Sequence, residues 1–349
     1  GDTHLLMGGR AVTGTTLTAV ASGYYHSCGL NGSGGVLCWG EGGSGQLGNG
    51  YFNDNATPVA VTGISNASQI AVGVYHSCAV LDNGSVKCWG QGSNYKLGNG
   101  SSSDQSTPVA VSGITGAVQV SLGLQYTCIR LSSGRVKCFG DESNSHMGDG
   151  RAASGVPGSV KNLSSRASAT AGDYHSCSVG SSGDVHCWGK NDVGQLGAGD
   201  LVTPRSEPNS ISGFSASDVS AGQSQTCAVS SGNVYCWGNA DLSGLNTNLY
   251  ATTVGGISTV TQSSLASSHV CARLSDGTVK CWGKGSNYQI GNGSVNTNYS
   301  TPFSVSGVNN VTEVIAGYGH TCAVLSNKTM KCWGTNESSE IGRASCRER

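Results

Sequence analysis

The fold is decided by the stretch His76-Ser77-Cys78-Ala79-Val80-Leu81-Asp82-Asn83-Gly84-Ser85-Val86-Lys87-Cys88-Trp89-Gly90, which recurs in variant form seven times. Each copy holds two cysteines followed directly by an aromatic residue. The first cysteines of successive copies lie 50, 50, 49, 50, 44 and 51 residues apart. Such a period is the signature of a repeat protein built by stacking one supersecondary unit. We therefore expect one repeat body at 9–342, a short N-terminal remnant at 1–8 and an off-pattern tail at 343–349.

A single repeat contains four short segments typical of strands, separated by turn residues. In the second repeat these are the apolar run Gln69–Val72, the segment His76–Leu81, the returning segment Ser85–Trp89 and the segment Thr107–Val111. Four short strands joined by turns make one propeller blade. The sequence therefore predicts an all-β fold, a seven-bladed β-propeller of four-stranded blades.

The central hairpin of each blade follows from the cysteine spacing. If Cys78 lies opposite Cys88, the loop has three residues, and its third position favours glycine because that position has positive φ. Lys328 departs from this rule in the seventh repeat, and the fifth repeat shortens the loop to Ser231-Gly232, which keeps its cysteines in register. The other repeats place glycine there: Gly34, Gly84, Gly134, Gly183 and Gly277.

Paired cysteines at this register predict one disulfide in each blade, because opposed residues of an antiparallel pair lie at disulfide distance. Buried free thiols are one alternative. A metal site is another, since a histidine precedes the first cysteine by two residues in five repeats, at His26, His76, His175, His269 and His320. We favour a hydrogen-bonding role for these histidines and expect no metal. The predicted disulfides are Cys28–Cys38, Cys78–Cys88, Cys128–Cys138, Cys177–Cys187, Cys227–Cys236, Cys271–Cys281 and Cys322–Cys332.

The aromatic residue after the second cysteine faces away from the disulfide, because side chains alternate along a strand. We expect it to pack against the next blade rather than to bind a ligand. These residues are Trp39, Trp89, Phe139, Trp188, Trp237, Trp282 and Trp333. The candidate binding residues then lie in loops between the blades: Tyr51, Asn53, Tyr95, Tyr250, Tyr288 and Tyr299.

Three motifs together carry a family resemblance: Gly-x-x-His-x-Cys-Ala-Val, Gly-x-Val-x-Cys-Trp-Gly and Gly-Gln-Leu-Gly, the last at Gly45–Gly48 and Gly194–Gly197. The chain resembles the regulator of chromosome condensation repeat family over nearly its whole length. That resemblance implies a seven-bladed propeller. The cysteine-containing form is similar to secreted bacterial versions of the repeat.

The two ends of the repeat body predict how the ring closes. The seventh repeat lacks its fourth strand, and residues Arg10–Gly14 supply a matching one, so we expect the N-terminal strand to complete the last blade. Such a splice removes an open sheet edge. The tail at 343–349, which contains the unpaired Cys346, fits no repeat, and we interpret it as artefactual.

Composition narrows the function. Net charge is −1 and no block of like charges occurs, which disfavours nucleic acid or an anionic membrane surface as partner. No apolar run reaches the length of a membrane span. The sequence has no nucleophile elbow, P-loop or metalloprotease motif, so we expect neither catalytic residues nor a cofactor. The paired cysteines favour an oxidising location: extracellular, cell surface or periplasmic.

Three functions remain open. The first is a monomeric, non-catalytic scaffold that docks a protein or a glycan on its loop faces; one use of this fold class is inhibition of a secreted enzyme. The second, implied by the family resemblance, is nucleotide exchange on a small GTPase. The third is a hydrolase or lyase acting in the central channel. We rank the third last because the repeats show no polar set at a plausible channel position.

Overall fold

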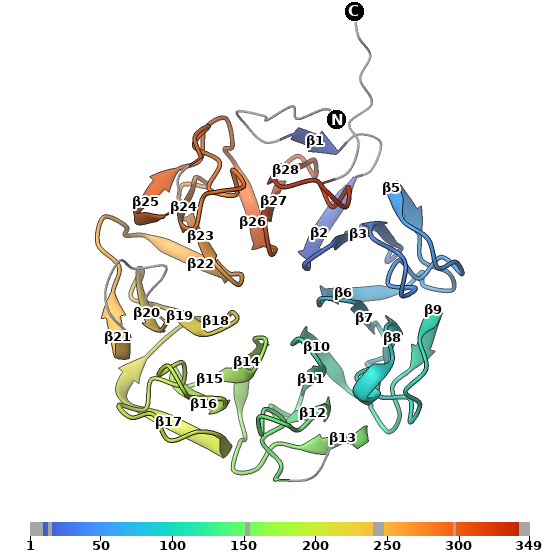
Figure 1. Cartoon of the computed structure of the whole chain (residues 1–349), viewed down its shortest axis with the longest axis horizontal. Coiled ribbons are helices and arrows are strands. Elements are labelled where there is room, and N and C mark those ends of the chain that lie inside the picture. Colours follow the sequence, from blue (N-terminus) through green and yellow to red (C-terminus); the bar gives the residue numbers. More distant parts are fainter. Residues whose placement is uncertain (1–9, 13–15, 151–153, 240–247, 296–297, 342–349) are drawn as a thin grey trace, which may run out of the picture.

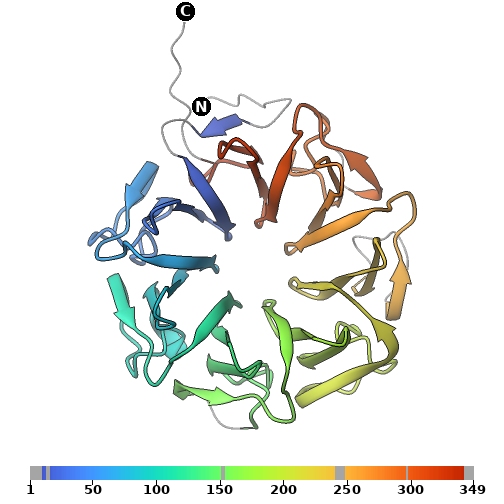
Figure 2. The same cartoon turned by 180° about the vertical axis from the view of Figure 1, so that it is seen from behind.

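The computed structural model describes residues 10–12, 16–150, 154–239, 248–295 and 298–341. Seven four-stranded antiparallel sheets stand around a common axis (Figures 1 and 2), which confirms the predicted propeller. In six blades the strands follow chain order from the axis to the rim. The expected remnant at 1–8 and the tail at 343–349 lie outside the described residues. No helix in the described part of the chain is long and apolar enough to cross a membrane.

The strands recur at equivalent positions in every repeat. The innermost strands are β2 (Leu17–Ser22), β6 (Ala67–Val72), β10 (Ala117–Leu122), β14 (Arg166–Ala171), β18 (Asp218–Ala221), β22 (Val260–Leu265) and β26 (Val311–Ala316). The second strands are β3 (His26–Asn31), β7 (His76–Leu81), β11 (Tyr126–Leu131), β15 (His175–Gly180), β19 (Gln225–Ser230), β23 (His269–Leu274) and β27 (His320–Leu325). The third strands are β4 (Val36–Gly40), β8 (Val86–Gly90), β12 (Val136–Gly140), β16 (Asp184–Gly189), β20 (Asn233–Gly238), β24 (Val279–Gly283) and β28 (Met330–Gly334). The outer strands are β5 (Asn55–Ala60), β9 (Gln105–Ala110), β13 (Ser154–Ser159), β17 (Arg205–Ser215), β21 (Asn248–Thr253), β25 (Tyr299–Ser304) and β1 (Arg10–Val12). A short 3₁₀ turn, η1 (Ser93–Tyr95), lies in one loop.

The ring closes as the sequence predicted. Strand β1 pairs antiparallel with β28, so that Arg10 lies opposite Cys332 and Val12 lies opposite Met330. The last blade therefore takes its outer strand from the N-terminal side of the chain (Figure 1). The remainder of the predicted closing strand, residues 13 and 14, lies outside the described part.

The central hairpins have the predicted register. Cys78 lies opposite Cys88 and Val80 opposite Val86, and all seven cysteine pairs are disulfides with Cα atoms 4.1 Å apart. Lys328 takes the left-handed conformation that glycine holds elsewhere, with φ of 65°. In the fifth blade Ser230 pairs with Asn233 across the shortened loop. These disulfides exclude the alternatives of free thiols and of metal ligation by the paired cysteines.

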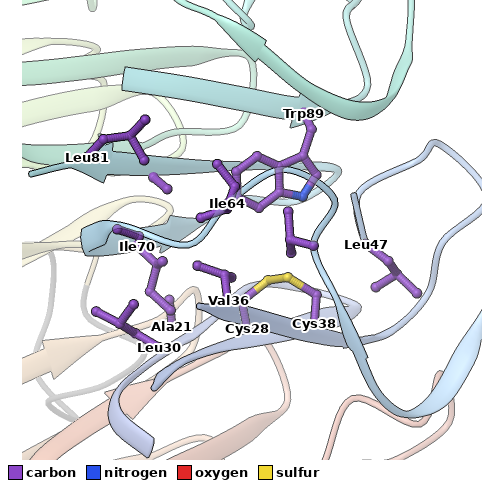
Figure 3. Close-up of a cluster of buried hydrophobic side chains, with 13 residues drawn as sticks. Ala21, Cys28, Leu30, Val36, Cys38, Leu47, Ile64, Ile70, Leu81 and Trp89 are labelled. Atoms are coloured by element: carbon purple, nitrogen blue, oxygen red, sulfur yellow. A yellow bond between two sulfur atoms is a disulfide. The ribbon is translucent and has the colours of Figure 1, made fainter. Parts of the chain in front are cut away.

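The core lies between the blades. In Figure 3, Trp89 of the second blade lies near the Cys28–Cys38 disulfide of the first, and all three belong to one buried cluster. The same arrangement closes the ring, where Trp39 of the first blade joins the cluster of Cys322 in the last. The aromatic residue is therefore inter-blade core, as predicted. It faces the preceding blade, however, and not the next one, because the disulfide occupies the face that meets the next blade.

Candidate functional site

The repeated histidines bind the blades to one another. The Nε2 atom of His26 lies 2.7 Å from the hydroxyl of Ser77 in the next blade. Ser77 donates its own hydrogen to the carbonyl of Gln46, 3.1 Å away, so the imidazole must donate to Ser77. The other histidines make the same contact: His76 to Thr127, His175 to Thr226, His269 to Thr321 and His320 to Ser27.

Burial keeps these histidines neutral and unavailable for acid–base chemistry. It lowers the pKa of His26 and of His175 to about 3, because the charged imidazolium is not solvated between the blades. Tyr126 replaces the histidine in the third blade and reaches Ser176 at 2.8 Å. Within the described ranges no cluster of three His, Cys, Asp or Glu side chains could hold a metal ion. The histidines therefore serve the blade interfaces, as we favoured from the sequence.

The Gly-Gln-Leu-Gly segment completes the same interface. The carbonyl of Gln46 accepts a hydrogen bond from the indole nitrogen of Trp89 at 2.9 Å, in addition to that from Ser77. The side chain of Gln46 accepts from the backbone N–H of Ser44 and so fixes the loop. Gly48 has φ of 67°, and a Cβ there would lie 2.7 Å from the Trp89 ring. Each repeated motif is thus used in holding adjacent blades together, and a functional site must lie elsewhere.

The loops gather on two faces because the strands of each blade alternate in direction. The face that carries the connections from first to second and from third to fourth strands is here called the loop face. The other, with the tight hairpins that join second and third strands, is called the hairpin face. Three candidate residues follow the third strands and belong to the loop face: Tyr51 is 66% exposed, Tyr95 is 40% exposed and Asn53 is also exposed. Phe52, which the sequence reasoning did not select, is 55% exposed beside them.

Three further tyrosines are placed differently from the expectation that all would be free loop residues. Tyr250 lies within the outer strand β21, although its side chain is 67% exposed. Tyr288 is half-buried. The prediction for Tyr299 is wrong: it lies in β25, only 8% exposed, with its ring 5.0 Å from that of Phe303. It is buried because the outer strand turns this residue toward the blade core.

A cavity of about 320 Å³ lies on the axis, here called the axial cavity, and all seven blades line it. Its walls are the innermost strands and the residues that follow them. The third residue of each equivalent innermost segment contributes a ring around the axis, and six of the seven are polar. The ring consists of Ala19, Gln69, Gln119, Ser168, Asp218, Gln262 and Glu313.

This ring contradicts the expectation that no polar set repeats around the channel. Five of its side chains accept hydrogen bonds from the free N–H groups of the neighbouring innermost strand: Gln69, Gln119, Asp218, Gln262 and Glu313. Gln69 accepts from Val120 at 2.9 Å, and Glu313 accepts from Val20 at 3.1 Å. Innermost strands have an unpaired edge, and these acceptors satisfy it. The signal in the sequence was a polar residue four positions before the glycine that follows the strand, as at Gln69 and Gly73.

The loop-face end of the axial cavity is aromatic and acidic. The hydroxyl of Tyr24 in the first blade donates to Asp173 in the fourth blade at 2.5 Å, so this hydrogen bond crosses the axis. Tyr24 also stacks on Tyr318, with ring centroids 4.3 Å apart, and Tyr25 stacks on Tyr75. Burial raises the pKa of Asp173 to about 6, although the Tyr24 hydrogen bond acts in the opposite direction.

Comparison with known proteins places this geometry in a family. Models of the regulator of chromosome condensation (RCC1) repeat match residues 33–80, 83–129, 182–229 and 276–324, and a second model of the repeat matches 17–46, 67–96, 117–146, 167–195 and 311–340. Protein pim1 of Schizosaccharomyces pombe is 33% identical over 88 residues, which are 22% of this chain and only 16% of that protein.

Solved structures share the fold at low identity. Yeast Prp20 matches with a TM-score of 0.79 and 18% identity, over 93% of this chain and 82% of that one. Human WBSCR16 matches with a TM-score of 0.81 and 18% identity, over 92% and 87%. The CRINKLY ectodomain of the Arabidopsis thaliana receptor kinase ACR4 matches with a TM-score of 0.56 and 19% identity, over 91% and 97%. Family models that match more than half of the chain, on a seven-bladed ring, establish that this chain belongs to the regulator of chromosome condensation (RCC1) repeat family.

Proposed function

We propose that the chain is a non-catalytic binding propeller that docks a partner protein on its loop face. One observation carries the proposal. The motif side chains that recur in the blades are buried in the interfaces, whereas aromatic side chains lie exposed on the loop face at Tyr51 and Phe52 and around the cavity mouth at Tyr318. Aromatic residues are enriched at protein interfaces because they contribute large contact areas at low entropic cost.

The disulfides support an oxidising location, which we propose to be extracellular, on the cell surface or periplasmic. Disulfides persist in such compartments and are rare in the reducing cytosol. All fourteen cysteines of the repeats are paired. The fold shared with a receptor-kinase ectodomain is consistent with this assignment.

Regulation of a small GTPase is the second candidate, and family membership favours it. The structural work on Saccharomyces cerevisiae Prp20 describes its binding properties to Gsp1p and histones. The disulfides weigh against a nuclear or cytosolic role for this chain. Partner docking on one face remains common to both candidates, and they differ in whether docking releases nucleotide.

The test compares the two faces of the intact, oxidised propeller. Partners are captured from the extracellular proteins of the source organism, and the affinity of each purified partner is then measured for a loop-face variant, Tyr51→Ser with Phe52→Ser. The matched control is Val118→Ser, an exposed apolar residue beside the hairpin loop at Gly84. We expect the loop-face variant to weaken binding about tenfold or more and the control to bind as wild type.

Three outcomes would overturn the proposal. The control could weaken binding while the loop-face variant does not, which would place the partner on the hairpin face. The propeller could accelerate nucleotide release from a small GTPase, which would favour the second candidate. Binding could go to a glycan array alone, which would replace the protein partner with a carbohydrate.

A further inference from the structure

The axial cavity has charged groups of one sign only. Three carboxylates line it, from Asp173, Asp218 and Glu313, which belong to the fourth, fifth and seventh blades. The lining contains no lysine, arginine or histidine. Among the described residues none of the three carboxylates makes an ion pair. Because buried charges are normally paired with an opposite charge, a cationic ligand would supply the countercharge that these three carboxylates lack.

The hydrogen-bonding groups of the lining point to the same kind of occupant. The hydroxyl oxygens of Ser168 and Ser267 are buried without a hydrogen-bond partner, although both residues line the cavity. The glutamine side chains of the ring, in contrast, are engaged with backbone groups, as Gln69 is with Val120. The lining therefore offers carboxylate and hydroxyl acceptors, and a ligand with N–H donors would satisfy them.

Aromatic rings stand at the entrance. Tyr24 and Tyr318 stack at the loop-face end, and Tyr318 is 42% exposed. Tyrosine faces attract organic cations electrostatically, and a neutral ligand of the same shape gains no such attraction. A divalent metal ion fits less well, since within the described ranges no three ligating side chains lie close enough together to hold one.

We propose that the axial cavity binds a small organic cation, a primary ammonium or guanidinium group on a short apolar stem. Its volume of about 320 Å³ lies at the small end of the range for ligand pockets. The N–H donors contact Asp218, Glu313 and Ser168, which occupy equivalent positions of the ring, and the stem extends toward the loop-face end, where the tyrosines stand. The cation is either a free molecule or an arginine or lysine side chain of a docked protein. The inference does not depend on the proposed docking partner, because occupancy of the cavity can be measured without one.

The experiment uses calorimetric titration of the intact oxidised protein with n-butylguanidinium and n-butylammonium. The uncharged n-butylurea serves as the matched probe for the guanidinium. An acetylated and amidated tripeptide with central arginine, and its citrulline counterpart, represent a side chain presented by a protein. We expect the cations to bind and the neutral analogues to bind at least tenfold more weakly.

Two isosteric variants assign the site. Glu313→Gln keeps the hydrogen bond to the neighbouring strand, because Gln262 makes the same kind of bond one blade earlier. Asp218→Asn likewise keeps an acceptor for Ser263. Each is expected to weaken cation binding about tenfold, as removal of one unit charge from a partly buried site does. The control Asp82→Asn removes the same charge from an exposed hairpin turn and is expected to change nothing.

The outcomes separate the possibilities. Binding of the free cations indicates a small-molecule ligand, and binding of the arginine peptide alone indicates a partner side chain. The proposal is overturned if the neutral probes bind as well as the cations, or if Asp82→Asn weakens binding as much as the axial variants. It is also overturned if no cationic probe binds to the intact protein, once a denaturant titration has shown that this protein is folded.

Discussion

The contact between His175 and Thr226 gives the sharpest test of the blade interface. The imidazole donates to the Thr226 hydroxyl across 2.7 Å, and the hydroxyl donates to the carbonyl of Gln195 across 2.8 Å. Thr226→Val preserves shape and removes only the hydroxyl. A neutral imidazole always carries one N–H, and the other ring nitrogen of His175 is also buried without a partner. Either tautomer therefore leaves a buried donor unsatisfied.

The magnitude follows from that orphaned donor. A buried unsatisfied group costs about 1–3 kcal/mol. The carbonyl of Gln195 keeps a second donor, the indole nitrogen of Trp237 at 3.0 Å, and adds little. We therefore expect Thr226→Val to lower the free energy of unfolding by about 2–3 kcal/mol. Thr107→Val, at an exposed outer-strand position, is the control and is expected to stay within about 0.5 kcal/mol.

One interface of this chain lacks both the histidine and the hydroxyl residue, so the two changes occur together naturally. In the next interface the histidine is replaced by Gln225 and the hydroxyl residue by Val270, and Gln225 donates instead to the carbonyl of Asn239. We therefore expect the double variant His175→Gln with Thr226→Val to cost about 1–2 kcal/mol less than the sum of the single variants.

The free energy of unfolding of each of these proteins is measured by urea titration with the disulfides intact, monitored by tryptophan fluorescence. The reasoning is refuted if Thr226→Val unfolds within 0.5 kcal/mol of wild type, or if the double variant costs the full sum of its single changes.

Three further predictions concern other interactions of the same interfaces. His175→Gln should destabilise the fold less as pH falls. The pKa of His175 is about 3 in the folded protein and about 6.5 in the unfolded chain, so through this residue the wild type loses about 1.4 kcal/mol of folding free energy per pH unit below about 6.5, and the variant does not. Urea midpoints at pH 8, 6 and 5 that show the same cost of the substitution at each pH would contradict this. Gly48→Ala should cost about 2 kcal/mol or more, because it combines a left-handed φ of 67° with a Cβ only 2.7 Å from Trp89, and thermal unfolding at the wild-type temperature would argue against it. Replacing Cys271 and Cys281 together by alanine should cost at most about 3 kcal/mol, since the hairpin already restrains the closed loop; a larger loss in urea would mean that the disulfide also supports the neighbouring blade.

The sequence predicted the blades well because the spacing between paired cysteines determines the register and loop length of each hairpin. A change of one residue in their spacing, at Cys227 and Cys236, fixes both the register and the loop length, and the structure has that register. The direction in which Trp89 packs could not be predicted, because alternation along a strand gives the face of a sheet but not which neighbour meets it.

The axial ring was missed for a related reason. Its members differ in kind, from Gln69 to Ser168 to Asp218, so comparison of residue identities does not reveal them. Six of the seven share an acceptor atom at a fixed strand position, a property that becomes visible only when the innermost strands are aligned. The cross-axis bond from Tyr24 to Asp173 has no signal in the sequence at all, because it joins blades that are three repeats apart.

The disulfides have a consequence for the order of assembly. Each joins cysteines only 9 or 10 residues apart, and none connects two blades. Short loops close most readily. If the chain enters an oxidising compartment with its N-terminal side leading, each hairpin can therefore be oxidised before the next repeat arrives. Oxidation in this order avoids mispaired cysteines without long-range exchange. Strand β1, in contrast, precedes all seven hairpins and has no partner until Met330–Gly334 has followed, so the covalent chemistry can proceed repeat by repeat while closure of the ring waits for the last hairpin.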